Sequence, residues 1–528
     1  MTKTKAEPTD AITDDMAAVV ADKDGKPWFT QCHLLRLNFC IGCLVLFSSA
    51  NGYDGSMMNG LQALPQWQDF AGHPTGAWLG FINAAQSLGS IVTYVVSPVL
   101  AQRYGRKLGM WLGFIMLILG VTLQTAAQNI ATFILGRFFM GVVTSFWGIS
   151  APLLITETAH PRHRAPLTAL YQCGWYVGSL VAAWATFGTR NYASSWAWRI
   201  PSVLQAAIPA VAFLGLLFAP ESPRYLVSRD RHEEARNLLV KHHAGGDAHS
   251  PIIEFEMAEI QATIQMEKEA HRTTSYLDMV KTPGNRHRLF ISVTLGFFAQ
   301  WNGVGVVSYY LALVLQTVGI TSVTDQTLIS GCLQIWNLII AVAAAFSVEK
   351  LGRRMLFMTS CIGMLVSYVI ITGLSGSFAN TGKGATGIAV IPFLFLYYGS
   401  YDIAFTPLVI SYTCEIWPYR LRARGLTVCS ISTMLALFFN IFVNPIALGN
   451  IGWKYYIVFV ALLIVITLTA WFAYPETKGY TLEEMAVIFD GEQAEVPEVT
   501  DTARKVAEAT GVDKTGLTTT HVEKLQQA

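Results

Sequence analysis

Arg103-Tyr-Gly-Arg-Lys107 returns in altered form as Lys350-Leu-Gly-Arg-Arg354, almost half the chain later. Two more motifs repeat in the same order. Glu157, Pro161 and Arg164 correspond to Glu415, Pro418 and Arg420, and Pro220-Glu-Ser-Pro-Arg224 corresponds to Pro475-Glu-Thr-Lys-Gly479. All three offsets lie near 250 residues. A repeat at three loci in one order predicts two related halves.

The composition indicates that these halves lie in a membrane. Of the 528 residues, 52% are hydrophobic and only 13% are charged, whereas soluble chains average about 25% charged residues. Apolar runs of roughly 20 residues, the length that crosses a bilayer, recur at Leu34–Asn51, Leu108–Ala127 and Tyr455–Tyr474. The net charge of +1 gives no case for a nucleic-acid partner. We therefore expect an all-α membrane protein whose surroundings are the lipid bilayer.

Twelve transmembrane helices are predicted, six in each pseudo-symmetric half. The expected spans are 34–60, 76–100, 108–127, 131–156, 166–188 and 199–219, then 287–316, 326–348, 355–375, 386–414, 426–448 and 453–474. The halves are thus 34–219 and 287–474, flanked by polar tails at 1–33 and 475–528. The segment between them, 220–286, is long and polar with an amphipathic helical pattern, and we expect a helical linker.

Positive charge predicts the orientation. Alternate connections carry dense basic clusters, and the connections between them are nearly free of Lys and Arg. The clusters are Arg103, Arg106 and Lys107; Arg162 and Arg164; Lys350, Arg353 and Arg354; and Arg420, Arg422 and Arg424. Because basic residues stay on the cytoplasmic side, the linker and both termini are expected in the cytoplasm.

Asp54 lies within the first expected span, where a carboxylate is costly and indicates a functional site with a partner. Arg137 lies in the fourth span. Each is about six residues, or roughly 9 Å, from the outer end of its span. Equal depth on two spans of one half allows an ion pair. Two roles stay open for it: a fixed pair that holds two helices together, or a carboxylate that gains and loses a proton as Arg137 moves.

A second set of charges clusters at the cytoplasmic ends of the spans. Topology explains the basic members but not the glutamates beside them, because acidic residues contribute little to orientation. We expect inter-helix ion pairs that close the cytoplasmic side in one state and break in the other. This expected gate comprises Arg103, Arg106, Glu157, Arg164, Glu221 and Arg224, with Lys350, Arg353, Arg354, Glu415, Arg422 and Glu476 in the second half.

Polar and aromatic residues inside the spans are candidates for substrate binding, since a binding cavity places few polar groups in mostly apolar walls. They are Gln172, Gln300, Asn302, Tyr309, Tyr310, Asn337, Asp402 and Asn440, with Trp301 and Trp336 as stacking surfaces. Polar contacts between helices are the common alternative for such residues. Asp402 is a second intramembrane acid that could serve substrate or protons, and the sequence does not choose between them.

Several motifs carry a family resemblance: the Gly-Arg loops at 105–107 and 352–354, Gly136-Arg137 with Gly141, the stretches 220–224 and 475–479, and Gln300–Tyr310. Over about residues 34–490 the chain resembles the sugar porter family of the major facilitator superfamily. Asn51–Ser56 and Tyr401–Pro407 look like the fungal branch of lactose and cellodextrin permeases. In two places the chain departs from the family pattern: Gln102 replaces an Asp, and Ala299 and Gly305 replace a Gln and an Asn typical of hexose carriers.

This resemblance implies the major facilitator fold, with no enzymatic activity and no cofactor or metal. It implies a secondary active transporter, a sugar/proton symporter that acts as a monomer in a fungal plasma membrane. Asp54 and Arg137 match the proton-coupling positions, and Gln172, Gln300 and Asn440 match sugar-contacting positions. A facilitator that moves no proton and a sugar sensor on a transporter fold remain alternatives.

Gly305 bears on substrate size. A missing side chain at this wall removes a hydrogen-bond partner that a single hexose would use, and it opens volume. A β-linked disaccharide of the lactose or cellobiose type, stacked on Trp301 or Trp336, is therefore expected to be carried better than glucose. Alternatively, Gly305 only lets two helices approach closely, as small residues do in membranes.

Overall fold

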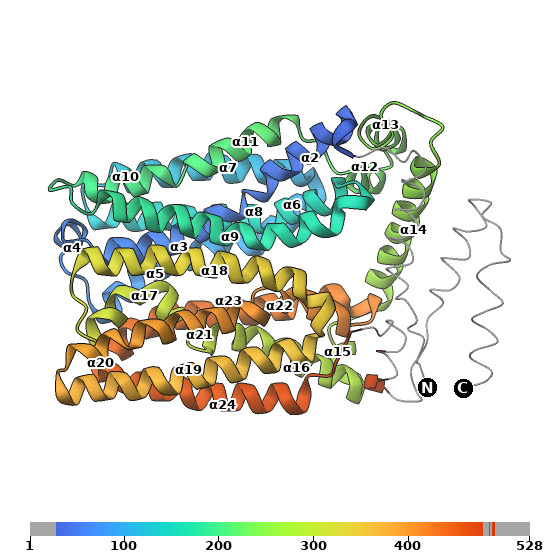
Figure 1. Cartoon of the computed structure of the whole chain (residues 1–528). Coiled ribbons are helices and arrows are strands. Elements are labelled where there is room, and N and C mark those ends of the chain that lie inside the picture. Colours follow the sequence, from blue (N-terminus) through green and yellow to red (C-terminus); the bar gives the residue numbers. More distant parts are fainter. Residues whose placement is uncertain (1–27, 479–484, 486–487, 491–528) are drawn as a thin grey trace.

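The computed structural model describes residues 28–478, 485 and 488–490, and every regular element within them is a helix. Figure 1 shows two bundles of roughly parallel helices, one drawn blue to green and the other yellow to red. The helices α12 to α15 of the linker lie at one end of the bundles, here called the linker end. The opposite end, where α4 and α20 lie, is called the far end. The expected all-α fold in two halves is confirmed.

Each expected span of the first half is a helix or a broken pair of helices, and most are long and apolar enough to cross a membrane. Their bounds are α2 (Cys32–Val45) with α3 (Ser48–Ala63), α5 (Gly76–Tyr94) with α6 (Val96–Tyr104), α7 (Arg106–Thr125), α8 (Ile130–Thr158), α9 (Pro161–Thr189), and α10 (Trp196–Leu204) with α11 (Ala207–Phe218). The short α4 (Pro65–Ala71) follows the first span. The second span bends by 45° between α5 and α6.

The second half repeats this plan. It comprises α16 (Pro283–Trp301) with α17 (Val304–Thr317), α18 (Val323–Leu351), α19 (Arg353–Thr381), α20 (Gly384–Ile388), α21 (Val390–Ala404) with α22 (Leu408–Ile416), α23 (Tyr419–Ile451), η3 (Gly452–Lys454) and α24 (Tyr455–Ala473). The seventh span begins four residues earlier than expected, because Pro283 starts α16 and the Thr282 hydroxyl caps its first turn. The tail expected at 475–528 lies mostly outside the described residues.

The breaks inside two spans have local causes. Gly303 has φ +102°, which glycine adopts without strain, and the Asn302 side chain accepts a hydrogen bond from the Val304 amide at 3.0 Å. This cap satisfies a backbone group that the broken seventh span leaves open. In the tenth span the helix stops at Ala404 and resumes after Pro407, whose ring leaves no amide hydrogen for a continuous helix.

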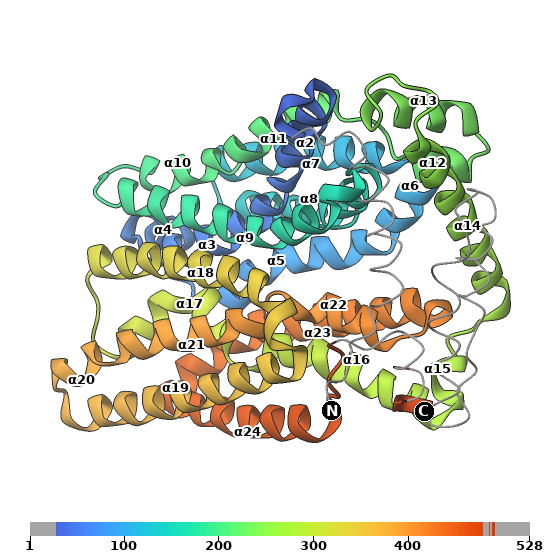
Figure 2. The same cartoon turned by 45° about the vertical axis from the view of Figure 1, so that its right-hand side comes forward.

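The linker folds into α12 (Pro223–Ser228), α13 (His232–His242), α14 (Pro251–Thr273) and α15 (Asp278–Lys281). His243 fixes it to the first half: its Nδ1 lies 2.7 Å from Glu256 of α14, and its Nε2 lies 3.2 Å from the Thr158 carbonyl of α8. Burial alone would lower the pKa of His243, but the Glu256 carboxylate raises it above the ordinary value. Figure 2 shows α14 running from the first half toward the second.

The two halves meet mainly at the far end and at mid-depth. At the far end, Asn59 and Gln62 of α3 donate to the backbone carbonyls of Ser308 and Tyr309 in α17, at 3.1 and 3.0 Å. At mid-depth, the Tyr176 hydroxyl of α9 donates to the Asp402 carboxylate of α21. In addition, α5 packs on α23 and α9 packs on α18, so the halves are joined by helix packing as well as by these side chains.

Within the first half, α3 and α9 approach too closely for any side chain at the crossing. A Cβ atom on Gly52 would lie 1.8 Å from the Trp175 carbonyl oxygen, and one on Gly178 would lie 1.8 Å from that of Ser49. Both obstacles are backbone atoms, which cannot rotate away. This crossing holds α3, which carries Asp54, against α9.

We expect Gly52→Ala to prevent correct packing, because the added methyl meets a carbonyl oxygen. Folded protein recovered as a single peak in detergent size-exclusion chromatography should fall at least fivefold. Gly42→Ala is the matched control, since no neighbouring atom in the described part of the chain lies within 4 Å of a Cβ atom there. Equal recovery of the two variants would contradict the close crossing of α3 and α9.

Candidate functional site

Asp54 of α3 and Arg137 of α8 meet in the middle of the first half. Arg137 Nη1 donates to Asp54 Oδ1 at 3.3 Å, and the two residues are 2% and 0% exposed. Arg137 also donates to the backbone carbonyls of Ile82 and Asn83 in α5, at 3.0 and 3.3 Å. The second carboxylate oxygen of Asp54 is buried and meets no donor among the described residues. The guanidinium is therefore held by α5, and the carboxylate depends on it.

Close helix packing makes these backbone contacts possible. A Cβ atom on Gly141 of α8 would lie 1.9 Å from the Gln86 carbonyl of α5, and one on Gly89 of α5 would lie 2.0 Å from the Phe138 carbonyl of α8. Side chains at these glycines would push α5 away. The Arg137 guanidinium would then lose its three acceptors on α5, which are the carbonyls of Ile82 and Asn83 and the side chain of Gln86. It would remain a buried cation with Asp54 as its partner, which is costly.

Four of the expected sugar ligands lie around the interface of the halves. Gln172 is exposed on α9, and Gln300 is half-buried on α16. Asn440 of α23 donates to the Gln300 carbonyl at 2.8 Å. Tyr309 of α17 is half-buried and close to the first half, because its ring lies 3.4 Å from a Cβ built on Gly55. These residues come from both halves, as a site between them requires.

Other expected ligands are engaged in contacts within the second half. Asn302 caps α17 and also accepts from the Tyr397 hydroxyl. Tyr310 donates to the Ile441 carbonyl at 2.5 Å, Trp301 to that of Ala436 at 3.2 Å, and Trp336 to that of Phe395 at 2.8 Å. Asn337 of α18 is buried, and its amide meets no partner among the described residues. The contacts of Asn302, Tyr310, Trp301 and Trp336 therefore match the alternative in which such residues join helices. Their sugar-binding roles stay predictions.

The space expected beside Gly305 is filled. A Cβ atom on Gly305 would lie 2.1 Å from Nδ2 of Asn440. The small residue therefore admits the carboxamide of α23 against α17, and it opens no volume for a second sugar ring. This corrects the structural basis on which a disaccharide was expected and agrees with the alternative of close helix approach.

The expected gate residues form two equivalent clusters at the linker end. Arg106 pairs with Glu157 at 2.8 Å, and Arg353 pairs with Glu415 at 3.0 Å. In each half a further glutamate accepts two backbone amides at the start of a helix: Glu221 from Arg106 and Lys107, and Glu476 from Arg353 and Arg354. A carboxylate there complements the positive end of the helix dipole.

These described ion pairs connect helices of one half and do not reach across to the other half. Arg164 and Arg224 instead lie near α14: Arg164 is 4.0 Å from Glu256 and from Glu259, and Arg224 pairs with Glu267. Arg103 and Arg422 lie beside the two clusters, at the end of α6 and in the first turn of α23. The sequence placed the right residues together but did not show that the pairs stay inside each half.

Tyr176 is a residue that the sequence did not single out. Its hydroxyl donates to Asp402 Oδ1, which also accepts from the Thr406 hydroxyl at 2.9 Å. Tyr176 follows Gln172 by four residues, so the two share one face of α9. Its four-residue spacing from an expected sugar ligand is the sequence feature that points to Tyr176.

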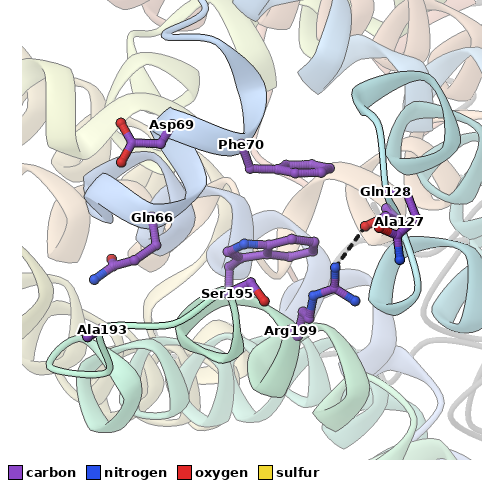
Figure 3. A pocket seen from close by; sticks show the side chains of 9 residues that line it. Gln66, Asp69, Phe70, Ala127, Gln128, Ala193, Ser195 and Arg199 are labelled. Carbon is purple, nitrogen blue, oxygen red and sulfur yellow. Dashed lines mark hydrogen bonds between the residues drawn. The ribbon is translucent and has the colours of Figure 1, made fainter.

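A separate hollow opens at the far end of the first half, with a volume of about 340 Å³. Figure 3 shows it between α4, the connection after α7 and the start of α10. Its lining is Gln66, Asp69, Phe70, Ala127, Gln128, Ala193, Ser195, Trp198 and Arg199. Arg199 already donates to the carbonyls of Thr125 and Ala127 at 2.8 and 2.9 Å. None of the expected site residues lines this hollow.

Comparison with known proteins assigns this architecture. The family described as "Sugar (and other) transporter" matches residues 40–489. The high-affinity glucose transporter of Kluyveromyces lactis is 26% identical over 458 residues, covering 82% of this chain and 81% of that protein. The MFS glucose transporter mfs1 of Aspergillus flavus is 27% identical, covering 87% and 90%. These relatives are glucose transporters by name, not lactose or cellodextrin permeases.

Among solved structures, the xylose transporter XylE from E. coli in an inward open conformation superposes with a TM-score of 0.70. The two are 21% identical, and the match covers 85% of this chain and 99% of that chain. This similarity shows that the two bundles and their connections have the major facilitator fold. The chain is a multi-pass membrane transporter, not an enzyme, and it belongs to the sugar porter family of the major facilitator superfamily.

Proposed function

We propose that this transporter imports a sugar together with protons, by exposing a site between its halves alternately to the two sides of the membrane. The buried Asp54–Arg137 pair is the observation that carries the proposal. A charge at this depth costs about 2.5–3.5 kcal/mol. A buried charge of this kind therefore indicates a function that offsets its cost. XylE, described in one solved structure as a proton:xylose symporter, has the same fold with a TM-score of 0.69.

The coupling follows from how the two groups are held. Arg137 is fixed by carbonyls of α5, whereas Asp54 has Arg137 as its ion-pair partner and belongs to α3. Any movement of α3 relative to α5 and α8 lengthens the ion pair. A carboxylate that loses its cation in an apolar site binds a proton, and one that regains the cation releases it. Because α3 also contacts α17 of the second half, this movement is linked to the rearrangement of the halves.

Asp54→Asn should separate binding from coupling. The amide keeps the shape and cannot exchange a proton, so the accumulation of labelled sugar above its external concentration should fall at least tenfold in intact cells. Exchange of internal for external sugar should retain more than a third of its rate, since that process needs no net proton movement. Asp325→Asn, at an exposed carboxylate at the start of α18, is the matched control. A variant at Asp54 that accumulates sugar to the wild-type ratio excludes this pair as a coupling site.

The linker end is proposed to face the cytoplasm of a fungal cell, at the plasma membrane. The basic clusters around Arg106 and Arg353 lie at this end beside the linker, and basic connections remain on the cytoplasmic side. An epitope inserted after Gly246 should therefore be labelled only in permeabilised cells, while one inserted after Asn191 at the far end should be labelled in intact cells. Both positions are exposed turns. The reverse labelling pattern would place the linker end outside the cell and contradict the proposed orientation.

The charge clusters at the linker end are proposed to hold together the spans that they connect, α7 with α8 in the first half and α19 with α22 in the second, while α3 belongs to neither cluster. Arg106–Glu157 and Arg353–Glu415 each connect two spans, and the glutamates at 221 and 476 join a third segment to them. Breaking one pair would loosen one half rather than open a barrier. The gate proposed here is therefore the contact between the two halves.

For the substrate, we propose a single hexose. The relatives are named for glucose, and the space beside Gly305 is filled by Asn440. Gln172, Gln300, Asn440 and Tyr309 are the proposed sugar ligands. In yeast lacking its own hexose uptake, labelled glucose should enter at least tenfold faster than lactose or cellobiose. Faster uptake of a β-linked disaccharide would restore the disaccharide hypothesis and refute the hexose proposal.

A further inference from the structure

Asp402 is a buried carboxylate at the junction of the two halves. It lies near the end of α21, just before the break in the tenth span, and is 0% exposed. Its Oδ1 accepts hydrogen bonds from Thr406 in its own span and from Tyr176 of the first half. Its Oδ2 is buried and meets no donor among the described residues.

The surroundings of Asp402 differ from those of Asp54 in one decisive respect. Asp54 has Arg137, whereas among the residues that the structure describes no Lys, Arg or His interacts with Asp402. Among the described residues, the titratable groups that interact with it are Cys173 and Tyr176 of α9 and Tyr397, Tyr398 and Tyr401 of its own helix. Tyr309 of α17 interacts in turn with Tyr398 and Tyr401. The helices α18 and α19, which also pack on α21, bring Trp336 and Tyr368 to this region. A negative charge without a cation is costly at such a site.

The position also ties Asp402 to the transport movement. Its hydrogen bond to Tyr176 crosses from one half to the other, and Tyr176 lies one helical turn from Gln172 on the same face of α9. Alternating access requires the halves to separate and rejoin along this surface. Separation removes the Tyr176 hydroxyl from the carboxylate and lets water reach it.

We propose that Asp402 is a second proton-binding site of the transport cycle. The acid holds a proton while it is sealed against Tyr176, because the sealed site supplies no cation. It releases the proton to water when the halves separate there. This assignment rests on the proposed symport and adds to it: Asp54 and Asp402 each carry one proton, so two protons move with each sugar.

The proton-to-sugar ratio tests this directly in proteoliposomes. With the membrane potential clamped at zero, the logarithm of the sugar accumulation ratio rises with the imposed pH difference, and its slope equals the number of coupled protons. We expect a slope of two for the wild type and one for Asp402→Asn, whose amide still accepts from Tyr176. Asp325→Asn should keep the wild-type slope. An unchanged slope in Asp402→Asn overturns the proposal, even if sugar affinity changes, because that outcome indicates a substrate contact or a permanently neutral acid.

A second variant keeps the test decisive if Asp402→Asn does not fold. Tyr176→Phe leaves the acid in place and removes a donor that favours its charged form. The pH at which sugar uptake is half-maximal should therefore shift toward alkaline values, with the slope still two. An unshifted pH profile in folded Tyr176→Phe contradicts the proposal. A slope of zero in the wild type would instead refute the proposed symport itself, which separates the two failures.

Discussion

The ion pair between Asp54 and Arg137 constrains how the helices of the first half pack. A guanidinium in the middle of a membrane needs acceptors for its whole fork, and here the neighbouring helix α5 supplies them from its backbone. Backbone carbonyls are within reach only because glycines at 89 and 141 bring α5 and α8 together. Asp54 is placed in turn by the close crossing of α3 and α9. The charge, the glycines and the helix crossings thus form one connected arrangement.

The second half contributes two broken spans that carry residues of the interface between the halves. Its seventh and tenth spans are each broken near the middle, at Gly303 and at residues 405–407. Broken helices are tolerated at this depth where other groups satisfy the freed backbone. One break is capped by Asn302, and the other places Asp402 and Thr406 beside Tyr176 of the first half. Discontinuous helices of this kind are typical of transporter binding sites.

The fold was largely predictable from the sequence, because apolar length and the repeated motifs depend on local patterns. The equal depth of Asp54 and Arg137 correctly brought them together. Contacts between distant side chains were less predictable. The sequence showed that Gly305 lacks a side chain, but not that Asn440 fills the place. It found the charged residues of the linker end but could not show that Arg106–Glu157 and Arg353–Glu415 each stay within one half. Tyr176 was overlooked, although its spacing of four residues from Gln172 places both on one face of α9.

Proton coupling is the central claim of this account, and it can be measured on the unmodified protein. Purified transporter in proteoliposomes with a pH-sensitive dye inside, and with no imposed gradient, is given glucose from outside. Symport predicts that the interior becomes acidic as sugar enters, and that a protonophore abolishes the change. Glucose entry without any change of internal pH would show that the protein is a facilitator and that the buried acids serve structure alone.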